Sequence, residues 1–537
     1  MDRSIEADVA HLGAASAPAE GAQRGLEVPA SARPSDAEIA TLLSGQRERG
    51  IPRRRRVYVN RTLRMDRIRA VGFDMDYTLA PYRVQRMEAQ AFELTVEVLV
   101  RERGYPAWLR QLRYDTEFMM RGLVVDTELG NVLKMDRFGH VGRVYHGRRP
   151  LTKEERFRLY RQQKIDFDSP RWVWLDTLFA LPEAALYAEV IEEAEARGEP
   201  VDYATLYRDI RASIDQVHRD GSLKAQVRRD LEGFIVRDPE LGPMLHRLRS
   251  SGKRLFVLTN SDWSYTDTVM RHLLDGVLPE YPSWRSYFDL VIVDAGKPGW
   301  FTEQRPFRAV NPGTGSLDPE PAKGRLVRGG VYSGGNLRDF EQWTELSGES
   351  VLYIGDHIYG DIVRTKRSGL WRTCMVVQEL EDEIAYVEGR EAGFDRLRAL
   401  DDLRFRLDDE ILVQKAVVAE LEDQVERAGG SAVAPLCDRL EEARRDLARL
   451  RDALKAVLGE MRTLAEDLER GYNAYWGLLF KEGAENSRFG EQVEDYACLY
   501  TGRVTNFLFY APSHYFRSRR EEMPHESVAE LSARTIP

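Results

Sequence analysis

Short apolar runs that stop at polar residues are the first pattern along this chain. Four runs have this form: AVGFD (70–74), RLFVLTN (254–260), DLVIVDAGK (289–297) and ESVLYIGD (349–356). Helical patterns lie between them, in AFELTVEVLVRERG, PMLHRLRSSGK, YTDTVMRHLL and GDIVRTKRSG. This alternation predicts an α/β fold, with a doubly wound, Rossmann-like parallel sheet covered by helices on both faces. Ligands bind outside the carboxyl ends of such strands, so the polar residues at the four ends are candidates for one site.

The spacing of the strand ends predicts a second domain. About 180 residues separate the first end from the second, which is too long for a crossover loop. We expect a domain of its own there, inserted into the first. Within it, TLYRDIRASIDQVHRDGSLK has the pattern of a helix that ends near Gly221.

Residues 400–470 follow a different pattern, with apolar positions that alternate steps of four and three. The repeat runs without a break from Leu436 to Leu468, and a weaker one includes Ile411, Val418, Leu421 and Val425. The stretch GGSAVAP (429–435) separates the two. Two antiparallel helices that pack through a heptad seam, as a coiled-coil hairpin with a Gly-Pro loop, are the natural interpretation. We interpret the hairpin first as a spine or self-association element, and second as an arm for a foreign partner.

The length of 537 residues leaves room for about three domains. The first 50 residues are rich in Ala, Gly, Ser and Pro, which favours disorder. The expected organisation is a disordered segment (1–50), a catalytic core (51–105 and 240–395), an inserted cap (106–239), the hairpin (396–475) and a C-terminal segment that packs on the core (476–537).

Charge and cysteine content exclude several classes of protein. The net charge of −10 argues against stable nucleic-acid binding. The run Arg53 to Arg56 could contact nucleic acid or an anionic membrane, but we favour a solvated or ion-paired entry to the first strand. Three distant cysteines form no disulfide or zinc pattern. With no long apolar stretch and no signal peptide, we expect a soluble cytoplasmic protein without a membrane partner.

The four strand ends carry the groups that phosphoryl transfer needs. They are Asp74 and Asp76; Thr259, Asn260 and Ser261; Lys297; and Asp356 and Asp361. A carboxylate can attack phosphorus to form an aspartyl-phosphate if its charge is offset. Mg²⁺ offsets that charge with oxygen ligands and binds the phosphate oxygens as well. Each motif alone is weak evidence, but their order and their shared place at strand ends favour this chemistry.

Each of these residues then has an expected role. Asp74 is the nucleophile, and Asp76 protonates the leaving group and later activates water. Lys297 neutralises charge in the transition state. Thr259, Asn260 and Ser261 are expected to hold the phosphate. For the metal we expect carboxylates of Asp74, Asp356 and Asp361 and the backbone carbonyl of Asp76. A capping or supporting role fits Ser261 and Asp361 equally well.

At these residues the chain resembles the haloacid dehalogenase (HAD) superfamily of phosphatases. It resembles the cytosolic purine 5′-nucleotidase family more closely, in FDMDYTLA, GLVVDTELGNVLKMD, IDQVHRDGSLK, LTNSDWSYTD, SYFDLVIVDAGKP, GVYSGGN, YIGDHIYGDIVRTKRSGLWRT and MPHES. The match runs in order from about residue 57 to 527. The resemblance implies a HAD core with a cap, and Mg²⁺-dependent hydrolysis of nucleoside 5′-monophosphates. It further implies a preference for 6-oxopurine nucleotides such as IMP and GMP, phosphoryl transfer to nucleosides, and a homo-oligomer, dimer or tetramer.

The resemblance also assigns residues in the inserted domain. Arg211 and Asp215 match positions that meet the base, and Lys224 matches one that meets the phosphate; surface ion pairing is the alternative for all three. After His146-Gly147 the family has an aromatic residue that stacks on the purine, whereas here Arg148 and Arg149 follow. Arg148 could stack on a base or bind a further anion. The alternative functions are a HAD phosphatase of another small phosphomonoester and a non-catalytic coiled-coil scaffold.

Overall fold

The computed structural model describes residues 50–363, 370–429 and 433–518. The segment predicted to be disordered, apart from Gly50, and the MPHES motif lie outside the described residues. The chain divides into two units, Met1–Ile51 and Pro52–Pro537. Every helix and strand of the described residues belongs to the second unit.

A ten-stranded sheet is the centre of the second unit, and its order is β1-β18-β15-β14-β3-β9-β10-β13-β11-β12. The four predicted apolar runs form neighbouring parallel strands: β14 (Val351–Gly355), β3 (Ala70–Phe73), β9 (Arg254–Leu258) and β10 (Leu290–Val293). The parallel strands β15 (Arg372–Val376) and β13 (Gly330–Gly334) flank them. From β3 the chain proceeds through β9, β10 and β13, then returns to β14 on the other side of β3. This reversal confirms the prediction of an α/β sheet, and it places a crevice beside β3.

Four further strands complete the edges of this sheet. β18 (Leu499–Thr501) runs parallel to β15, and β1 (Tyr58–Val59) pairs with β18 antiparallel. At the opposite edge β11 (Phe307–Val310) and β12 (Leu317–Pro321) form an antiparallel pair next to β13. The C-terminal segment therefore contributes a strand to the sheet, through β18.

Both faces of the sheet are buried. Along β9, Leu255 and Val257 belong to one apolar cluster, whereas Phe256 and Leu258 belong to another. The same alternation holds along β10 and β14. Because successive side chains of a strand point to opposite faces, apolar layers cover the sheet on both sides. The helices include α8 (Leu241–Ser250), α9 (Trp263–Leu274), α10 (Leu337–Thr344), α12 (Leu380–Glu388) and α15 (Arg488–Tyr496).

The long insertion between β3 and β9 holds a sheet of its own. Its five strands follow the order β7-β6-β5-β4-β8 and pair antiparallel. They are β4 (Val124–Asp126), β5 (Asn131–Met135), β6 (Val141–His146), β7 (Arg149–Pro150) and β8 (Trp172–Trp174).

Its helices are α3 (Lys153–Tyr160), α4 (Leu181–Ala196), α5 (Tyr203–Arg219), α6 (Ser222–Arg229) and α7 (Leu231–Phe234). Helix α2 (Val84–Glu102) packs against α4, α5 and α6. The predicted boundary near residue 105 stays a prediction.

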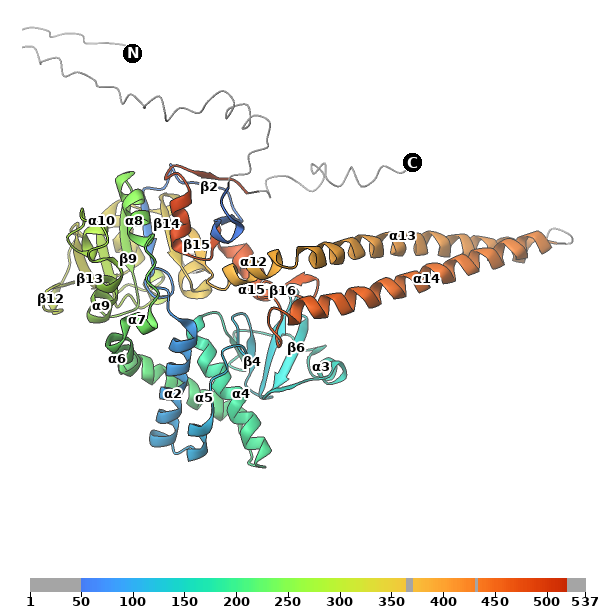
Figure 1. Ribbon diagram of the computed structural model, residues 1–537, viewed down its shortest axis with the longest axis horizontal. Helices are drawn as coiled ribbons and strands as arrows, with labels where there is room; N and C mark the ends of the chain where they lie inside the picture. The colour runs from blue at the N-terminus through green and yellow to red at the C-terminus, as the bar shows by residue number, and fades with distance from the viewer. Residues whose placement is uncertain (1–49, 364–369, 430–432, 519–537) are drawn as a thin grey trace, which may run out of the picture. The chain divides into compact units, whose positions relative to one another are not determined.

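Two long helices, α13 (Glu391–Arg427) and α14 (Val433–Arg470), lie side by side in Figure 1. They run antiparallel, because Arg396 near the start of α13 pairs with Glu460 late in α14 at 2.8 Å, whereas Gln414 further along α13 donates to the carbonyl of Ala443, earlier in α14, at 3.0 Å. The two-helix prediction is confirmed, but the predicted loop 429–435 is wrong at its end. Pro435 lies in the first turn of α14, where a residue without an N–H costs no helical hydrogen bond. Residues 430–432 lie outside the described part.

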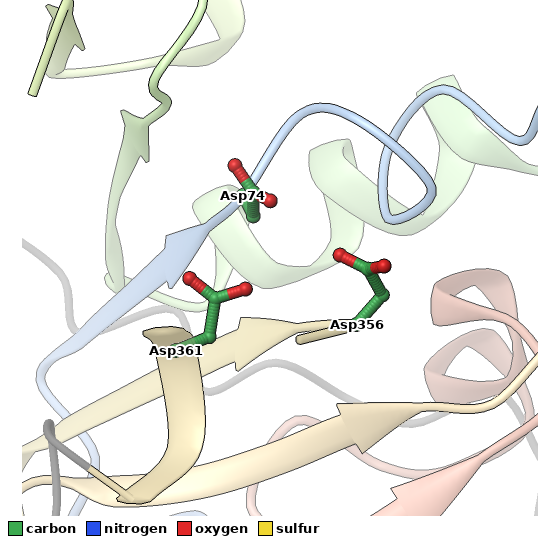
Figure 2. Close-up of side chains that lie close together, drawn as sticks. All are labelled: Asp74, Asp356 and Asp361. Atoms are coloured by element: carbon green, nitrogen blue, oxygen red, sulfur yellow. The ribbon is translucent and has the colours of Figure 1, made fainter. Parts of the chain in front are cut away.

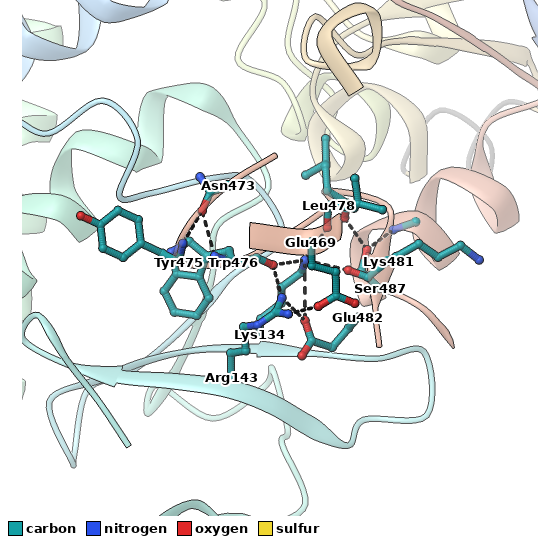
Figure 3. A network of polar contacts seen from close by, with 12 residues as sticks. Lys134, Arg143, Glu469, Asn473, Tyr475, Trp476, Leu478, Lys481, Glu482 and Ser487 are labelled. Atoms are coloured by element: carbon teal, nitrogen blue, oxygen red, sulfur yellow. Dashed lines mark hydrogen bonds and ion pairs between the residues drawn. The ribbon is translucent and has the colours of Figure 1, made fainter. Parts of the chain in front are cut away.

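A network of polar contacts ties the end of α14 to the inserted sheet (Figure 3). Lys134 of β5 is 1% exposed, and its ammonium donates to the carbonyls of Trp476, Leu478 and Lys481 at 2.5–2.8 Å. Arg143 of β6 pairs with Glu469 and, at 3.3 Å, with Glu482. Because Glu469 belongs to the last turn of α14, the hairpin and the inserted sheet share one buried polar cluster.

The N-terminal arginine run is ion-paired, as interpreted from the sequence. Arg53 and Arg54 lie 3.9 and 3.8 Å from Glu388, and Arg55 pairs with Glu240. Among the helices of the described ranges, none is both long and apolar enough to cross a lipid bilayer.

Candidate active site

Three buried aspartates meet where β3 and β14 end (Figure 2). Asp74 directly follows β3, Asp356 directly follows β14, and Asp361 lies in the single π-helical turn Ile358–Val363. One carboxylate oxygen from each lies within 4.8 Å of the others, and all three residues are buried. The parallel pairing of β3 with β14 continues to Asp74, whose N–H donates to Ile354 at 2.9 Å. The strand register itself therefore brings these distant positions together.

A single ammonium group faces this carboxylate cluster. Lys297 follows β10, and its Nζ lies 2.9 Å from Asp74 Oδ1, 2.7 Å from Asp361 Oδ1 and 3.0 Å from the Tyr353 hydroxyl. Burial lowers the pKa of Lys297, but the two carboxylates outweigh burial, so its pKa lies well above the usual value. Lys297 is therefore charged. Three carboxylates against one ammonium leave an excess of negative charge in a buried place when all are ionised.

The electrostatics of the aspartates show the cost of that excess. Burial raises the pKa of Asp74 to about 7, although Lys297 opposes the rise. Burial and the neighbouring aspartates also raise the pKa of Asp356 well above its usual value. The Oδ2 atom of Asp356 is buried without a hydrogen-bond partner among the described residues. Three converging carboxylate oxygens and an unpartnered acceptor fit an oxygen-ligated divalent cation such as Mg²⁺.

Asp76 lies on the loop after β3, and two hydroxyl groups hold its side chain. Tyr82 donates to Oδ1 at 2.6 Å, and Ser261 donates to Oδ2 at 2.8 Å. The loop turns sharply here, because Tyr77 has a left-handed φ of 55° and Asp76 forms a bridge with Ala80. The carboxylate of Asp76 is not part of the three-aspartate cluster. The expected metal contact through its backbone carbonyl stays a prediction.

The TNS motif after β9 supports the site in two ways. Thr259 is fully buried, and its hydroxyl accepts from the Ser261 N–H at 3.1 Å. The amide side chain of Asn260 donates to the Lys297 carbonyl at 3.0 Å and accepts from the Lys297 N–H at 2.7 Å. Asn260 thus fixes the loop that carries the ammonium. Asn260 and Ser261 both line the cavity above the aspartates.

A cavity of about 370 Å³ opens over the cluster. The inserted segment supplies part of its wall, and sequence reasoning missed most of those residues: Thr177, Phe179, His218, Arg219 and Leu223. The ring of His218 meets Phe179 edge to face, with centroids 5.6 Å apart. Burial lowers the pKa of His218 to about 4, so the imidazole is neutral near pH 7. Both His218 and Arg219 belong to the quoted motif IDQVHRDGSLK, which was the available signal; Phe179 had none.

Of the predicted residues in the inserted domain, Lys224 reaches the cavity. Its Nζ donates to Asp262 at 2.8 Å, which links α6 to the start of α9. Arg211 and Asp215 do not line the cavity, because Arg211 pairs at 3.0 Å with the buried Glu183 and at 3.2 Å with Asp215. The alternative of helix-surface ion pairing therefore describes these two.

Arg148 does not line the cavity either. Its guanidinium pairs with Asp115 at 2.8 Å and with Glu189. It also lies 4.0 Å from the ring centre of Phe118. Two carboxylates and an aromatic ring thus occupy this side chain, and it has no contact with the aspartate cluster among those described.

A further residue that the sequence did not indicate is Arg121. Its side chain is fully buried and pairs with Glu379 through two nitrogens. Its remaining nitrogen donates to the backbone carbonyl of Asp356 at 2.9 Å. Arg121 precedes β4, so the inserted segment directly holds the end of β14. A lone arginine in an apolar stretch gives no sequence signal for this role.

Comparisons with known proteins all indicate one family. The family model described as the 5′ nucleotidase family matches residues 57–528. A 5′-nucleotidase domain-containing protein of Dictyostelium discoideum is 30% identical over 485 residues, which cover 88% of this chain and 74% of that protein. Proteins named 5′-nucleotidase domain-containing protein 2 from Rattus norvegicus and Homo sapiens are each 30% identical over 483 residues. Those alignments cover 88% of this chain and 80% and 85% of the two relatives.

Proposed function

The chain belongs to the 5′-nucleotidase family and is a phosphomonoester hydrolase, and from this premise we propose that it hydrolyses nucleoside 5′-monophosphates through an aspartyl-phosphate on Asp74. The observation that supports this mechanism best is the buried cluster of Asp74, Asp356 and Asp361 around Lys297. We also propose that the sheet and its insertion are a HAD-type core and cap.

We propose Mg²⁺ as the cofactor, held by the carboxylates of Asp74, Asp356 and Asp361 and by the backbone carbonyl of Asp76. When bound, Mg²⁺ offsets the excess negative charge and polarises the phosphoryl group. The unpartnered Oδ2 of Asp356 supports the assignment, because a buried acceptor normally has a partner. Asp361 already accepts a hydrogen bond from Lys297, so its carboxylate would contact both the ammonium of Lys297 and the cation.

The chemical steps then follow from the positions of the side chains. Asp74 attacks phosphorus, and the bond from phosphorus to the ribose 5′-oxygen breaks. Asp76 gives that oxygen a proton, then takes a proton from the water that hydrolyses the acyl phosphate. Lys297 balances the charge that grows on the phosphoryl oxygens. The hydroxyls of Tyr82 and Ser261 can donate or accept, so Asp76 keeps its partners in both protonation states.

We propose 6-oxopurine nucleotides, IMP and GMP, as preferred substrates. The supporting observation is the aromatic and neutral pair of Phe179 and His218 in the cavity wall, a surface on which a flat base can stack. Arg148 takes no part in this proposal, so the stacking role expected from the resemblance passes to Phe179. Contacts of Arg211 and Asp215 with the base require the ion pairs of Arg211 with Glu183 and with Asp215 to open. Phosphoryl transfer to a nucleoside, a cytoplasmic location and homo-oligomerisation belong to the same proposal.

A panel of phosphate-release assays tests the proposal. Wild type is assayed with IMP, GMP, AMP and ribose 5-phosphate, in Mg²⁺ and in EDTA. We expect kcat/KM to be highest for IMP and GMP, and release to stop in EDTA. A site built around a base should reject ribose 5-phosphate, because this compound has no base to stack on the cavity wall. Equal rates for all four compounds would exclude base reading and favour the broader phosphatase.

One variant and a matched control test the assignment of Asp74 as the nucleophile. Asp76→Asn should form the aspartyl-phosphate and hydrolyse it slowly, so that mass spectrometry finds the phosphoryl group on the peptide that contains Asp74. The exposed pair partner Asp66 offers a matched carboxylate-to-amide control, Asp66→Asn, which should keep wild-type rates. A phosphoryl group on any other peptide would reject Asp74 as the nucleophile.

A further inference from the structure

The outer side of α13 carries large apolar side chains that stay more than half exposed, although the guanidinium of Arg404 lies 4.3 Å from the ring centre of Phe405. The core between α13 and α14 is already complete, with Ile411, Val418, Leu421, Leu440, Ala443 and Leu447 buried together. Yet Phe405, Leu412 and Val413 remain 58%, 62% and 60% exposed. Apolar side chains that are more than half exposed on one helix favour an interaction surface.

Phe405 and Leu412 belong to a second heptad repeat, which we call the outer seam, and Val413 lies at its flank. It comprises Arg398, Asp402, Phe405, Asp409, Leu412, Ala416, Ala419 and Asp423, in alternating steps of four and three. Each position precedes a position of the inner seam, such as Ile411 or Val418, by two residues. Two residues rotate an α-helix by about 200°, so the outer seam lies almost opposite the hairpin core. All its members are exposed except Asp423, which is half-buried.

The matching positions of α14 are different in kind. Two residues before its inner seam lie Ala434, Asp438, Glu441, Arg445, Ala448, Asp452, Lys455, Gly459, Arg462 and Glu466. This side of α14 is therefore a charged, solvated surface. The contrast within one hairpin shows that the apolar seam belongs to α13 alone.

We propose that the outer seam of α13 binds the outer seam of a second copy of this chain, antiparallel and around a two-fold axis. Antiparallel pairing sets Phe405 of one copy against the small Ala416 of the other, and Arg398 against Asp423. At the flanks it sets Arg406 near Glu420 and Asp408 near Lys415. Two-fold symmetry makes each of these contacts twice. Opposite charges at the flanks and ends choose partner and orientation in such pairs.

A parallel arrangement conflicts with the same residues. It would place Asp402, Asp409 and Asp423 each against its own copy, and like charges across a seam repel. The antiparallel arrangement removes these repulsions within the seam. It sets Asp402 against Ala419 and Asp409 against Leu412, which adds little, and one like-charged pair, Asp401 and Glu422, remains at the flank. The two hairpins would then form a row of four helices, with the two α13 helices inside and one α14 at each outer side. The partner that fits this surface by charge and by size is a second copy.

Mixed cross-linking tests the pairing and its direction. Phe405→Cys and Ala416→Cys are made in separate full-length chains, one of them tagged, in a Cys437→Ser background because Cys437 is the one partly exposed cysteine of the three. After mild oxidation we expect disulfide-linked dimers in the mixture and none in either chain alone. Dimers of Phe405→Cys alone would show parallel pairing, and the absence of dimers in every sample would overturn the proposal.

Light scattering measures the association without a cross-link. Leu412→Lys should halve the mass of the wild-type particle, or lower it to that of the next smaller assembly. Leu458→Lys is the matched control, since Leu458 of α14 is 46% exposed and lies outside the outer seam. It should keep the wild-type mass, and both variants should keep wild-type helicity by circular dichroism. A monomeric wild type, or an unchanged mass for Leu412→Lys, would contradict the proposal.

Discussion

Two buried lysines of this protein have opposite surroundings. Lys134 donates to three backbone carbonyls, and with Arg143 it faces the two carboxylates of Glu469 and Glu482. Lys297 faces the carboxylates of Asp74 and Asp361, with Asp356 close by. The first cluster is balanced, two cations against two anions. The second holds three carboxylates against one ammonium.

The pKa values of the two lysines are shifted in opposite directions. Burial lowers the pKa of Lys134 to about 8, and Glu482 only partly offsets it. The pKa of Lys297 is instead raised well above its usual value, because two carboxylates outweigh burial. A cluster whose ion pairs match its cations with anions stabilises the fold, whereas one with unpaired carboxylates needs a ligand to complete it. We therefore interpret the Lys134 cluster as structural and the Lys297 cluster as functional.

The largest expected difference between the clusters is catalytic. Asp74→Asn should lower kcat by about four orders of magnitude or more, because it removes the nucleophile. Its free energy of unfolding should not fall, since one charge of an over-negative cluster is lost. Phosphate release and urea unfolding measure the two effects. An unfolding free energy well below wild type would show that the cluster stabilises the fold.

Lys134→Met should have the opposite profile. It leaves three carbonyls and the carboxylate of Glu482 without their cation, so the free energy of unfolding should fall by about 3 kcal/mol. The cavity is not lined by this residue, so kcat of the folded variant should stay within about twofold of wild type. Lys153→Met, at an exposed lysine, serves as the control in the same urea titration. A large loss of kcat without a loss of stability would reject the structural role.

Glu88 is a buried acid outside both lysine clusters, and a single hydroxyl group donates to it. Burial raises its pKa to about 8, although Tyr114 donates to it at 2.6 Å. Between its unfolded value near 4.5 and about 8, the folded state binds the extra proton, so stability falls as pH rises, by up to about 1.4 kcal/mol per pH unit. Glu88→Gln removes the ionisation and should flatten this slope. Unfolding free energies at pH 5, 6, 7 and 8 measure it, and an unchanged slope would contradict the assignment.

Tyr82→Phe should have the smallest effect. It removes one of two hydrogen bonds to Asp76, which corresponds to about 1 kcal/mol and hence roughly a fivefold loss of kcat. If Asp76 is the acid/base that we propose, the pH profile of kcat should shift while KM for IMP stays near wild type. Tyr265→Phe, which removes the next hydroxyl along the chain of hydrogen bonds, is the graded comparison. An identical pH profile for Tyr82→Phe would exclude the positioning role.

The sequence predicted that the polar residues at the strand ends lie together, because each of them follows a buried apolar run. Strand register then brings Asp74, Asp356 and Lys297 together, and their catalytic roles stay predictions. Contacts of Arg211 and Asp215 with a base also stay predictions; both share a helix with His218, but Arg211 pairs with the buried Glu183, distant in sequence, and neither residue lines the cavity. Arg121 and Lys134 could not be predicted, because their partners, backbone carbonyls and for Arg121 also Glu379, come together only in the tertiary fold.

The heat stability of Asp356→Asn in the presence and absence of Mg²⁺ is the most direct test of the proposed metal site. The aspartate cluster carries excess negative charge that we propose a divalent cation offsets, and Asp356 Oδ2 is an acceptor without a hydrogen-bond partner among the described residues. In EDTA, Asp356→Asn should therefore melt at or above the midpoint of wild type, because repulsion is relieved. Added Mg²⁺ should raise the midpoint of wild type and leave that of Asp356→Asn unchanged. A variant that melts lower in EDTA and still responds to Mg²⁺ would contradict the account.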